Sequence, residues 1–140
     1  MADIIYDSFM SELALGNHDL EDDTIKIALL KNTHTPSSDD DDFADVSGDE
    51  NPAGSGYTSG GETLANVAVT ESGVTITVDA DDPLWSALTA TNLRYAVIYN
   101  DTHASDGLIY LFDFGADKSP SGENFTIQFD SDGIFTMAQA

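Results

Sequence analysis

The chain contains no cysteine and very few basic residues. The absence of cysteine excludes disulfides, thiolate zinc sites and cysteine nucleophiles, so stability must come from packing, hydrogen bonds and association. Aspartate and glutamate number 26 against 4 lysines and arginines, which gives a formal net charge of −22. Because nucleic-acid binding needs lysine and arginine to displace counterions from phosphates, this balance argues against a nucleic-acid partner.

The acidic excess also bears on the habitat of the protein. Carboxylates repel one another in dilute salt, whereas at molar salt the Debye length falls to about 3 Å and the repulsion is screened. The shortage of lysine beside abundant aspartate therefore favours adaptation to a saline environment. The alternative is that the acid keeps a concentrated protein soluble.

Long apolar runs are missing as well. No stretch approaches the roughly 20 apolar residues that cross a bilayer, and residues 1–5 lack the basic and apolar regions of a secretory signal. We therefore expect a soluble protein without a membrane partner, made in the cytoplasm of its host. With 140 residues, 41% of them hydrophobic, the chain is predicted to form one domain (1–140) with one core.

Residues 1–16 predict an N-terminal helix. Asp3 suits the N-cap, apolar residues recur every four positions from Ile5 to Leu13, and Gly16 supplies the stop. A helix this short is unstable alone, so its apolar stripe must pack on the body or on a partner.

The spacing of apolar residues then changes from near four to two. Val74, Ile76 and Val78 alternate with Thr75 and Thr77, which predicts a half-buried hairpin with the three aliphatic side chains facing the core. Further strand-like segments lie at 24–30, 67–69, 83–85, 93–99, 108–112, 125–129 and 134–137. About seven strands with polar turns, among them a turn at 119–122, predict a mainly-β fold, an antiparallel sandwich or barrel.

Residues 32–61 are poor in apolar side chains and include four consecutive aspartates at 39–42. A stretch of this length without regular structure is normally functional or mobile. The sequence therefore predicts a long, polar, acidic loop.

The residues that commonly carry catalysis are few and scattered. His18, His34 and His103 each lie in a polar, turn-like stretch, which predicts solvated loop residues rather than general bases. Residues 56–60 imitate a serine elbow with the serine one place late, and no phosphate loop, dinucleotide fingerprint or zinc-protease motif is present. We therefore expect no catalytic site and no cofactor. Five aromatic residues in predicted strands are assigned to the core rather than to a ligand platform: Trp85, Tyr95, Tyr99, Tyr110 and Phe112.

A structural cation is the one ligand that the composition favours. Calcium takes six to eight oxygen ligands, and acidic turns supply them. No EF-hand loop is complete, because no glutamate follows Gly133 at the closing position, and solvated acid is the alternative reading. The candidate ligands are Asp39, Asp40, Asp41 and Asp42 with Asp45, the group Asp79, Asp81 and Asp82, and Asp130 with Asp132.

The order of several short phrases resembles a family of small structural proteins encoded with the head genes of tailed bacteriophages and related archaeal viruses. The resemblance spans nearly the whole chain, and the excess aspartate at 39–42 departs from it. The phrases are Asp-Thr-Ile-Lys-Ile-Ala-Leu-Leu at 23–30, Thr-Pro at 35–36, Gly-Tyr-Thr-Ser-Gly-Gly at 56–61, Asp-Ala-Asp-Asp at 79–82 leading to Trp85, Arg-Tyr-Ala-Val-Ile-Tyr at 94–99, Asp-Phe-Gly-Ala-Asp-Lys at 113–118, and the ending from Phe125 to Phe135.

The resemblance implies a non-enzymatic virion component, most directly a capsid decoration or cement protein that binds the major capsid protein or another virion protein. Such a protein works through symmetric assembly, and we expect a homo-oligomer, most simply a trimer. Loop 32–61 and the N-terminal helix are the expected contact surfaces. The alternatives are a tail or baseplate component, a calcium- or carbohydrate-binding attachment module, and a hydrolase with an acidic site.

Overall fold

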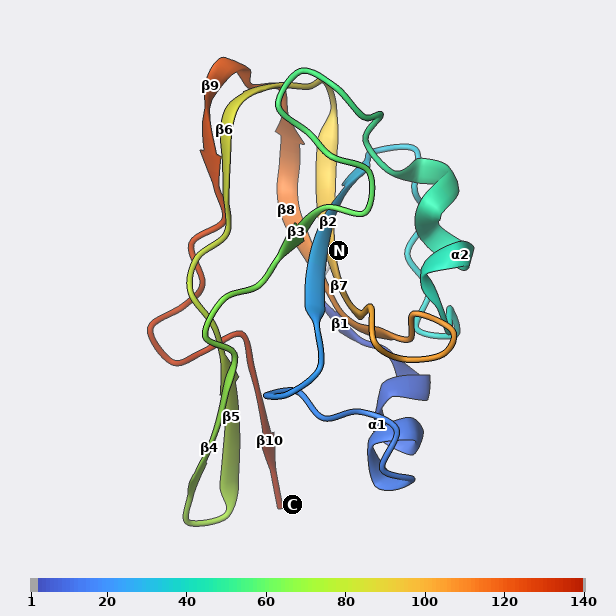
Figure 1. The fold of residues 1–140 in the computed structure, drawn as a ribbon, viewed down its shortest axis with the longest axis vertical. Helices are drawn as coiled ribbons and strands as arrows, with labels where there is room; N and C mark the ends of the chain where they lie inside the picture. Colours follow the sequence, from blue (N-terminus) through green and yellow to red (C-terminus); the bar gives the residue numbers. More distant parts are fainter. Residues whose placement is uncertain (1–2, 140) are drawn as a thin grey trace.

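The computed structural model describes residues 3–139, which form a mainly-β fold (Figure 1). These residues contain ten strands in three antiparallel sheets, two short α-helices and one 3-10 turn. The predicted mainly-β antiparallel class is confirmed. Two strands that were not predicted, β1 (Ile4–Ile5) and β3 (Glu62–Thr63), have two residues each and are too short to show a periodicity. No helix in this part of the chain has the length and apolar character needed to span a membrane.

The largest sheet has five strands and holds the centre of the core. Its strands β2 (Ile25–Lys31) and β7 (Leu93–Asn100) lie inside the sheet, and most of their residues are buried. A strand covered on both faces has apolar residues in succession rather than in alternation, which explains the run of aliphatic side chains in β2. In order across the sheet the strands are β1 (Ile4–Ile5), β8 (Leu108–Lys118), β7 (Leu93–Asn100), β2 (Ile25–Lys31) and β3 (Glu62–Thr63).

A second layer packs on one face of this sheet. It consists of the ribbon β6 (Leu84–Thr89) with β9 (Ser121–Thr126), and of the sheet β10 (Phe135–Ala138), β5 (Thr75–Asp79) and β4 (Ala68–Ser72), at the left in Figure 1. Trp85 is fully buried and lies 6.1 Å from the ring of Phe125, so its predicted place in the core is confirmed. The predicted turn 119–122 and strand 125–129 are displaced, because β9 already begins at Ser121 and ends at Thr126.

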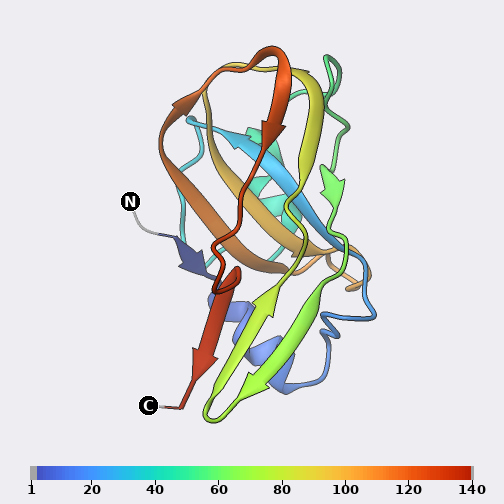
Figure 2. The same cartoon turned by 90° about the vertical axis from the view of Figure 1, so that its left-hand side faces the viewer.

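The N-terminal helix is shorter than predicted. Helix α1 spans Asp7–Ala14, whereas residues 4–5 form β1 at the edge of the large sheet. Asp3 caps no helix: its carboxylate accepts hydrogen bonds from the hydroxyl of Tyr110 and a backbone amide of β8. Phe9 is fully buried against Phe135 of β10, so the helix covers the inner side of the small sheet (Figure 2). Residues 1–2 of the predicted helix lie outside the described residues.

The predicted long polar segment 32–61 contains no named strand, but part of it is more regular than predicted. The segment contains α2 (Phe43–Val46), which begins with a capping box between Asp42 and Asp45, and a 3-10 turn, η1 (Ser47–Asp49). The Glu50 carboxylate then accepts hydrogen bonds from the Tyr57 hydroxyl (2.8 Å) and from a backbone amide (2.6 Å). Nearby carboxylates thus accept hydrogen bonds from backbone N–H groups of the segment. Because these bonds order the segment, it needs few apolar residues.

The hairpin prediction is confirmed in its pairing and corrected in its burial. Strands β4 and β5 pair antiparallel, with Ser72 opposite Thr75 across a two-residue turn. Val78 is buried, but Ile76 is 36% exposed and Val74, which lies in the turn, is 64% exposed. The hairpin extends beyond the body of the protein (Figure 1), so only its inner end reaches the core. A large loss of stability is therefore not expected for Ile76→Ala.

Candidate functional site

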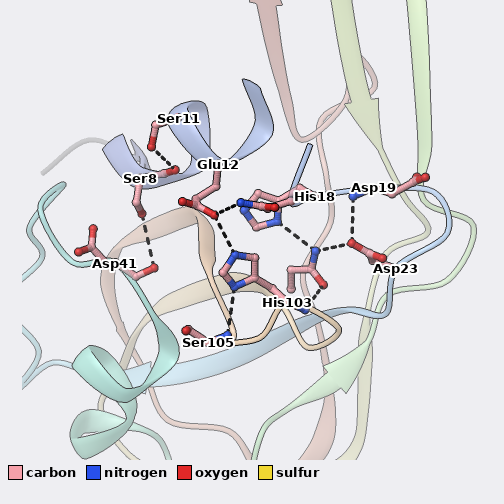
Figure 3. A network of polar contacts seen from close by, with 11 residues as sticks. Ser8, Ser11, Glu12, His18, Asp19, Asp23, Asp41, His103 and Ser105 are labelled. Carbon is pink, nitrogen blue, oxygen red and sulfur yellow. Dashed lines mark hydrogen bonds and ion pairs between the residues drawn. The ribbon is translucent and has the colours of Figure 1, made fainter. Parts of the chain in front are cut away.

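Two histidines far apart in the sequence stack on each other beside α1 (Figure 3). The ring centroids of His18 and His103 lie 4.9 Å apart with an interplanar angle of 18°. His18 is buried at 7% exposure, and His103 is largely covered. The prediction of solvated loop histidines is therefore wrong for this pair. It is also wrong for His34, which is 6% exposed and contacts an Asp49 carboxylate oxygen at 3.3 Å.

The side chain of Asn100, at the end of β7, makes hydrogen bonds to three parts of this site. Its side-chain oxygen accepts hydrogen bonds from the backbone amides of Thr102 (2.9 Å) and His103 (3.1 Å). Its amide nitrogen therefore faces Asp23 (2.7 Å) and Nδ1 of His18 (3.0 Å) as a donor. Because His18 Nδ1 accepts, the imidazole is neutral with its proton on Nε2.

The second histidine links the 101–107 loop to α1. Nδ1 of His103 accepts a hydrogen bond from the backbone amide of Ser105 (3.2 Å), so Nε2 carries the proton and donates to Glu12 (3.2 Å). Glu12 also accepts from the Asn17 side chain at 2.6 Å. The hydrogen bonds from Asn17 and His103 hold the pKa of Glu12 below its usual range.

Burial controls the titration of His18. Removal from water disfavours the charged ring, and the neighbouring His103 disfavours it further, so the pKa of His18 is lowered despite the nearby carboxylates. Gly107 makes this close packing possible: a Cβ there would lie 3.1 Å from Cε1 of His18 and 3.2 Å from Nδ1 of His103.

An open groove of about 640 Å³ lies beside this network. Two of the three serines on its wall are bound elsewhere: Ser8 Oγ donates to the backbone oxygen of Asp41 (3.5 Å), and Ser11 Oγ donates to that of Ser8 (3.0 Å). The third, Ser105, contacts His103 through its backbone amide. Within residues 3–139, neither ring of the stacked pair makes a hydrogen bond to a hydroxyl nucleophile. The arrangement ties three chain segments together: α1, the turn at 17–23 and the 101–107 loop.

Several of the candidate metal ligands accept hydrogen bonds from other protein groups. Asp79 accepts from the backbone amide of Ala80, Asp81 from the Asn66 side chain, and Asp82 from the backbone amide of Phe129. Asp42 and Asp45 form the capping box of α2, and Asp45 also accepts from the backbone amides of Asp41 and Asp42. The Asp130 carboxylate accepts from the backbone amide of Asp132 at 2.9 Å. Among the described residues, no group of three or more histidine or acidic side chains has the arrangement of a metal site. Asp39–Asp42 and the 130–133 turn also lie in different elements and form no common cluster.

The lowered pKa of His18 predicts acid sensitivity. In the unfolded chain a histidine titrates near pH ~6.5. Below that pH His18 binds a proton more readily in the unfolded chain than in the folded chain, which favours unfolding. The contribution of His18 to the free energy of unfolding is therefore full above about pH 6.5 and is lost as the pH falls towards the pKa of His18 in the folded protein. We expect the melting temperature to fall between pH 7.5 and 5, measured by calorimetry at constant molar salt, and His18→Gln to reduce that fall.

The matched control for this experiment is Asn17→Ala, which removes a hydrogen bond from the same network without removing a titrating ring. It should lower the melting temperature similarly at both pH values and keep the wild-type dependence on pH. An unchanged pH dependence in His18→Gln would contradict the assignment.

Comparison of the chain with protein-family models, with curated proteins and with solved structures gives no match.

Proposed function

We propose that the chain is a non-enzymatic structural protein of a virus particle, a decoration or cement protein that binds the outer surface of the shell. The observation that carries the proposal is the sequence resemblance to head-gene structural proteins, which extends from Asp23 to Phe135. Its partner is the major capsid protein or another virion protein, and its working form is a symmetric homo-oligomer, most simply a trimer. The acidic composition fits a particle that assembles and persists in high salt.

The positions of the resembling phrases support this proposal. Residues 23–30 include most of β2, and residues 94–99 lie within β7. These two strands pair with each other inside the large sheet. Residues 56–61 close against β2 through Tyr57, whose hydroxyl accepts from the backbone amide of Leu29 at 3.1 Å. The resemblance thus falls on residues that determine the fold, as expected for relatives that share an architecture.

The chemistry of the histidine site also fits a structural role. His18 and His103 each use a ring nitrogen to accept a hydrogen bond from a neutral protein donor, and Asn100 uses both ends of its amide. Such a network rigidifies the end of the sheet where the 101–107 loop meets α1.

A protein inventory of purified particles tests the proposal. Mass spectrometry should find this chain in intact particles in numbers comparable to those of the shell subunits, and particles from a gene deletion should lose it. The deleted particles should also be less resistant to heat and to low salt, because each bound copy stabilises the assembled state. Absence from the particle overturns the proposal, and presence in detached tails alone assigns the chain to the tail or baseplate.

A further inference from the structure

The small sheet β10-β5-β4 has one polar and one apolar face. In the pairing register, Thr70 lies opposite Thr77 and Ser72 opposite Thr75, so hydroxyl side chains share one face. The alternate residues share the other face, which is directed towards α1. This second face carries Val69, Ile76, Val78, Phe135 and Met137, with one carboxylate, Glu71, opposite Ile76.

Only part of this apolar face is covered. Val78 and Phe135, near the body, are buried, whereas Val69 and Ile76, towards the tip, are 38% and 36% exposed. A groove of about 330 Å³ opens there, between the hairpin and the chain that follows α1, with Leu20 on its far wall. Figure 2 shows α1 behind the hairpin and the following segment emerging beside it.

Strand β4 forms a free edge beside this groove. Within residues 3–139 its only strand partner is β5, and all five of its residues are exposed. Because Ser72 and Thr75 close a two-residue hairpin, alternation turns the backbone groups of Val69 and Glu71 outward. The outward amide of Val69 is bound by a carboxylate oxygen of Glu21 at 3.4 Å, a long contact that another acceptor can replace.

The charge around the groove is of one sign. Asp19 and Glu21 line it, Glu71 lies on the adjacent edge, and among the described residues no lysine or arginine lines it. A second copy docked through the same surface would bring these carboxylates against an identical acidic rim, which opposes self-association at this place. The complementary occupant is apolar in the groove and positively charged at its flanks.

We propose that the β4 edge and its groove bind an extended segment of a partner protein, which adds as a strand next to β4. Its backbone pairs with Val69 and Glu71, an apolar side chain enters the groove against Ile76, and a flanking lysine or arginine pairs with Glu21 as that carboxylate leaves the Val69 amide. The inference rests on the proposed function only in placing that segment on a neighbouring shell protein. Loop 32–61, which is tied down at Glu50, is the less suitable contact surface.

The test uses the full chain and the peptide acetyl-Lys-Thr-Val-Thr-Val-Thr-Lys-amide, in which alternation puts the lysines and valines on one face. The glutamate-flanked version acetyl-Glu-Thr-Val-Thr-Val-Thr-Glu-amide is the control. Nuclear magnetic resonance titration should shift the Val69, Glu71 and Ile76 amides and slow the solvent exchange of the Glu71 amide. We expect the glutamate-flanked peptide to bind at least tenfold more weakly. Ile76→Ser should weaken binding of the lysine peptide by a similar factor, while Thr70→Ser, on the opposite face, should leave it unchanged.

Several outcomes overturn the inference. These are no binding of the lysine peptide, equal binding of both peptides, or shifts centred away from β4. Shifts of the same residues on raising protein concentration without peptide assign the groove to a second copy instead. None of these results depends on whether the chain is found in particles, so failure here and failure of the proposed function are distinguishable.

Discussion

Gly61→Ala is expected to destabilise this protein by about 4 kcal/mol or more, the range in which a substitution disrupts the fold. Gly61 has φ +82°, where side chains are strained, and it lies directly against β2. A Cβ at this position would lie 2.6 Å from the carbonyl carbon of Ile27 and 2.7 Å from Cα of Ala28. Both atoms belong to the backbone of an inner strand, so relief requires moving the sheet.

Gly115→Ala is the matched control, because Gly115 also has positive φ, +76°, but no neighbouring atom lies within 4 Å of the position that a Cβ would take there. It should lose only about 1–2 kcal/mol, the conformational penalty of the left-handed region. Urea unfolding at constant molar salt measures both, since guanidinium is itself a salt and would screen the acidic surface. Equal losses in the two variants would show that the contact with β2 does not matter. If Gly61→Ala does not fold at all while Gly115→Ala does, the loss of stability exceeds what unfolding can measure, and the prediction holds.

Periodicity predicted the strands well where a strand has a clear inside and outside or is wholly buried. The apolar run at 24–30 became β2, the segment 93–99 became β7, and Trp85 is in the core as expected. Periodicity does not say how far a strand extends beyond the body. Ile76 shares a face with the buried Val78, yet it lies past the part of that face which α1 covers.

The histidine site was not predictable from spacing. His18 follows α1 and His103 follows β7, and only the order of strands in the large sheet brings their segments together. Both stand among polar neighbours, the usual signal of exposure, but here those neighbours are the hydrogen-bond partners that make burial possible. Asn100 gives the one local signal: a polar residue that ends the apolar strand β7 and is fully buried in the structure.

The melting temperature is expected to rise strongly between 0.05 and 2 M sodium chloride. Of the four basic residues, only Arg94 forms ion pairs with carboxylates within residues 3–139, at 2.8 Å to Asp113 and 3.8 Å to Asp117. The acidic surface is therefore largely uncompensated, and the folded state holds its carboxylates closer together than the unfolded chain does. Added salt screens this repulsion, because the Debye length falls from roughly 10 Å at 0.1 M to about 3 Å at 1 M.

A charge-reduced variant separates screening of repulsion from a general effect of salt on apolar burial. Four exposed carboxylates that accept no hydrogen bond within residues 3–139 are suitable for neutralisation: Asp22→Asn, Asp39→Asn, Asp101→Asn and Asp132→Asn. Their combined replacement changes the net charge from −22 to −18, since −22 + 4 = −18. If repulsion is the cause, this variant melts higher than the wild type at 0.05 M salt, and the two converge at 2 M. Parallel salt curves for the two proteins would assign the effect to apolar burial, and a flat wild-type curve would remove the case for adaptation to a saline environment.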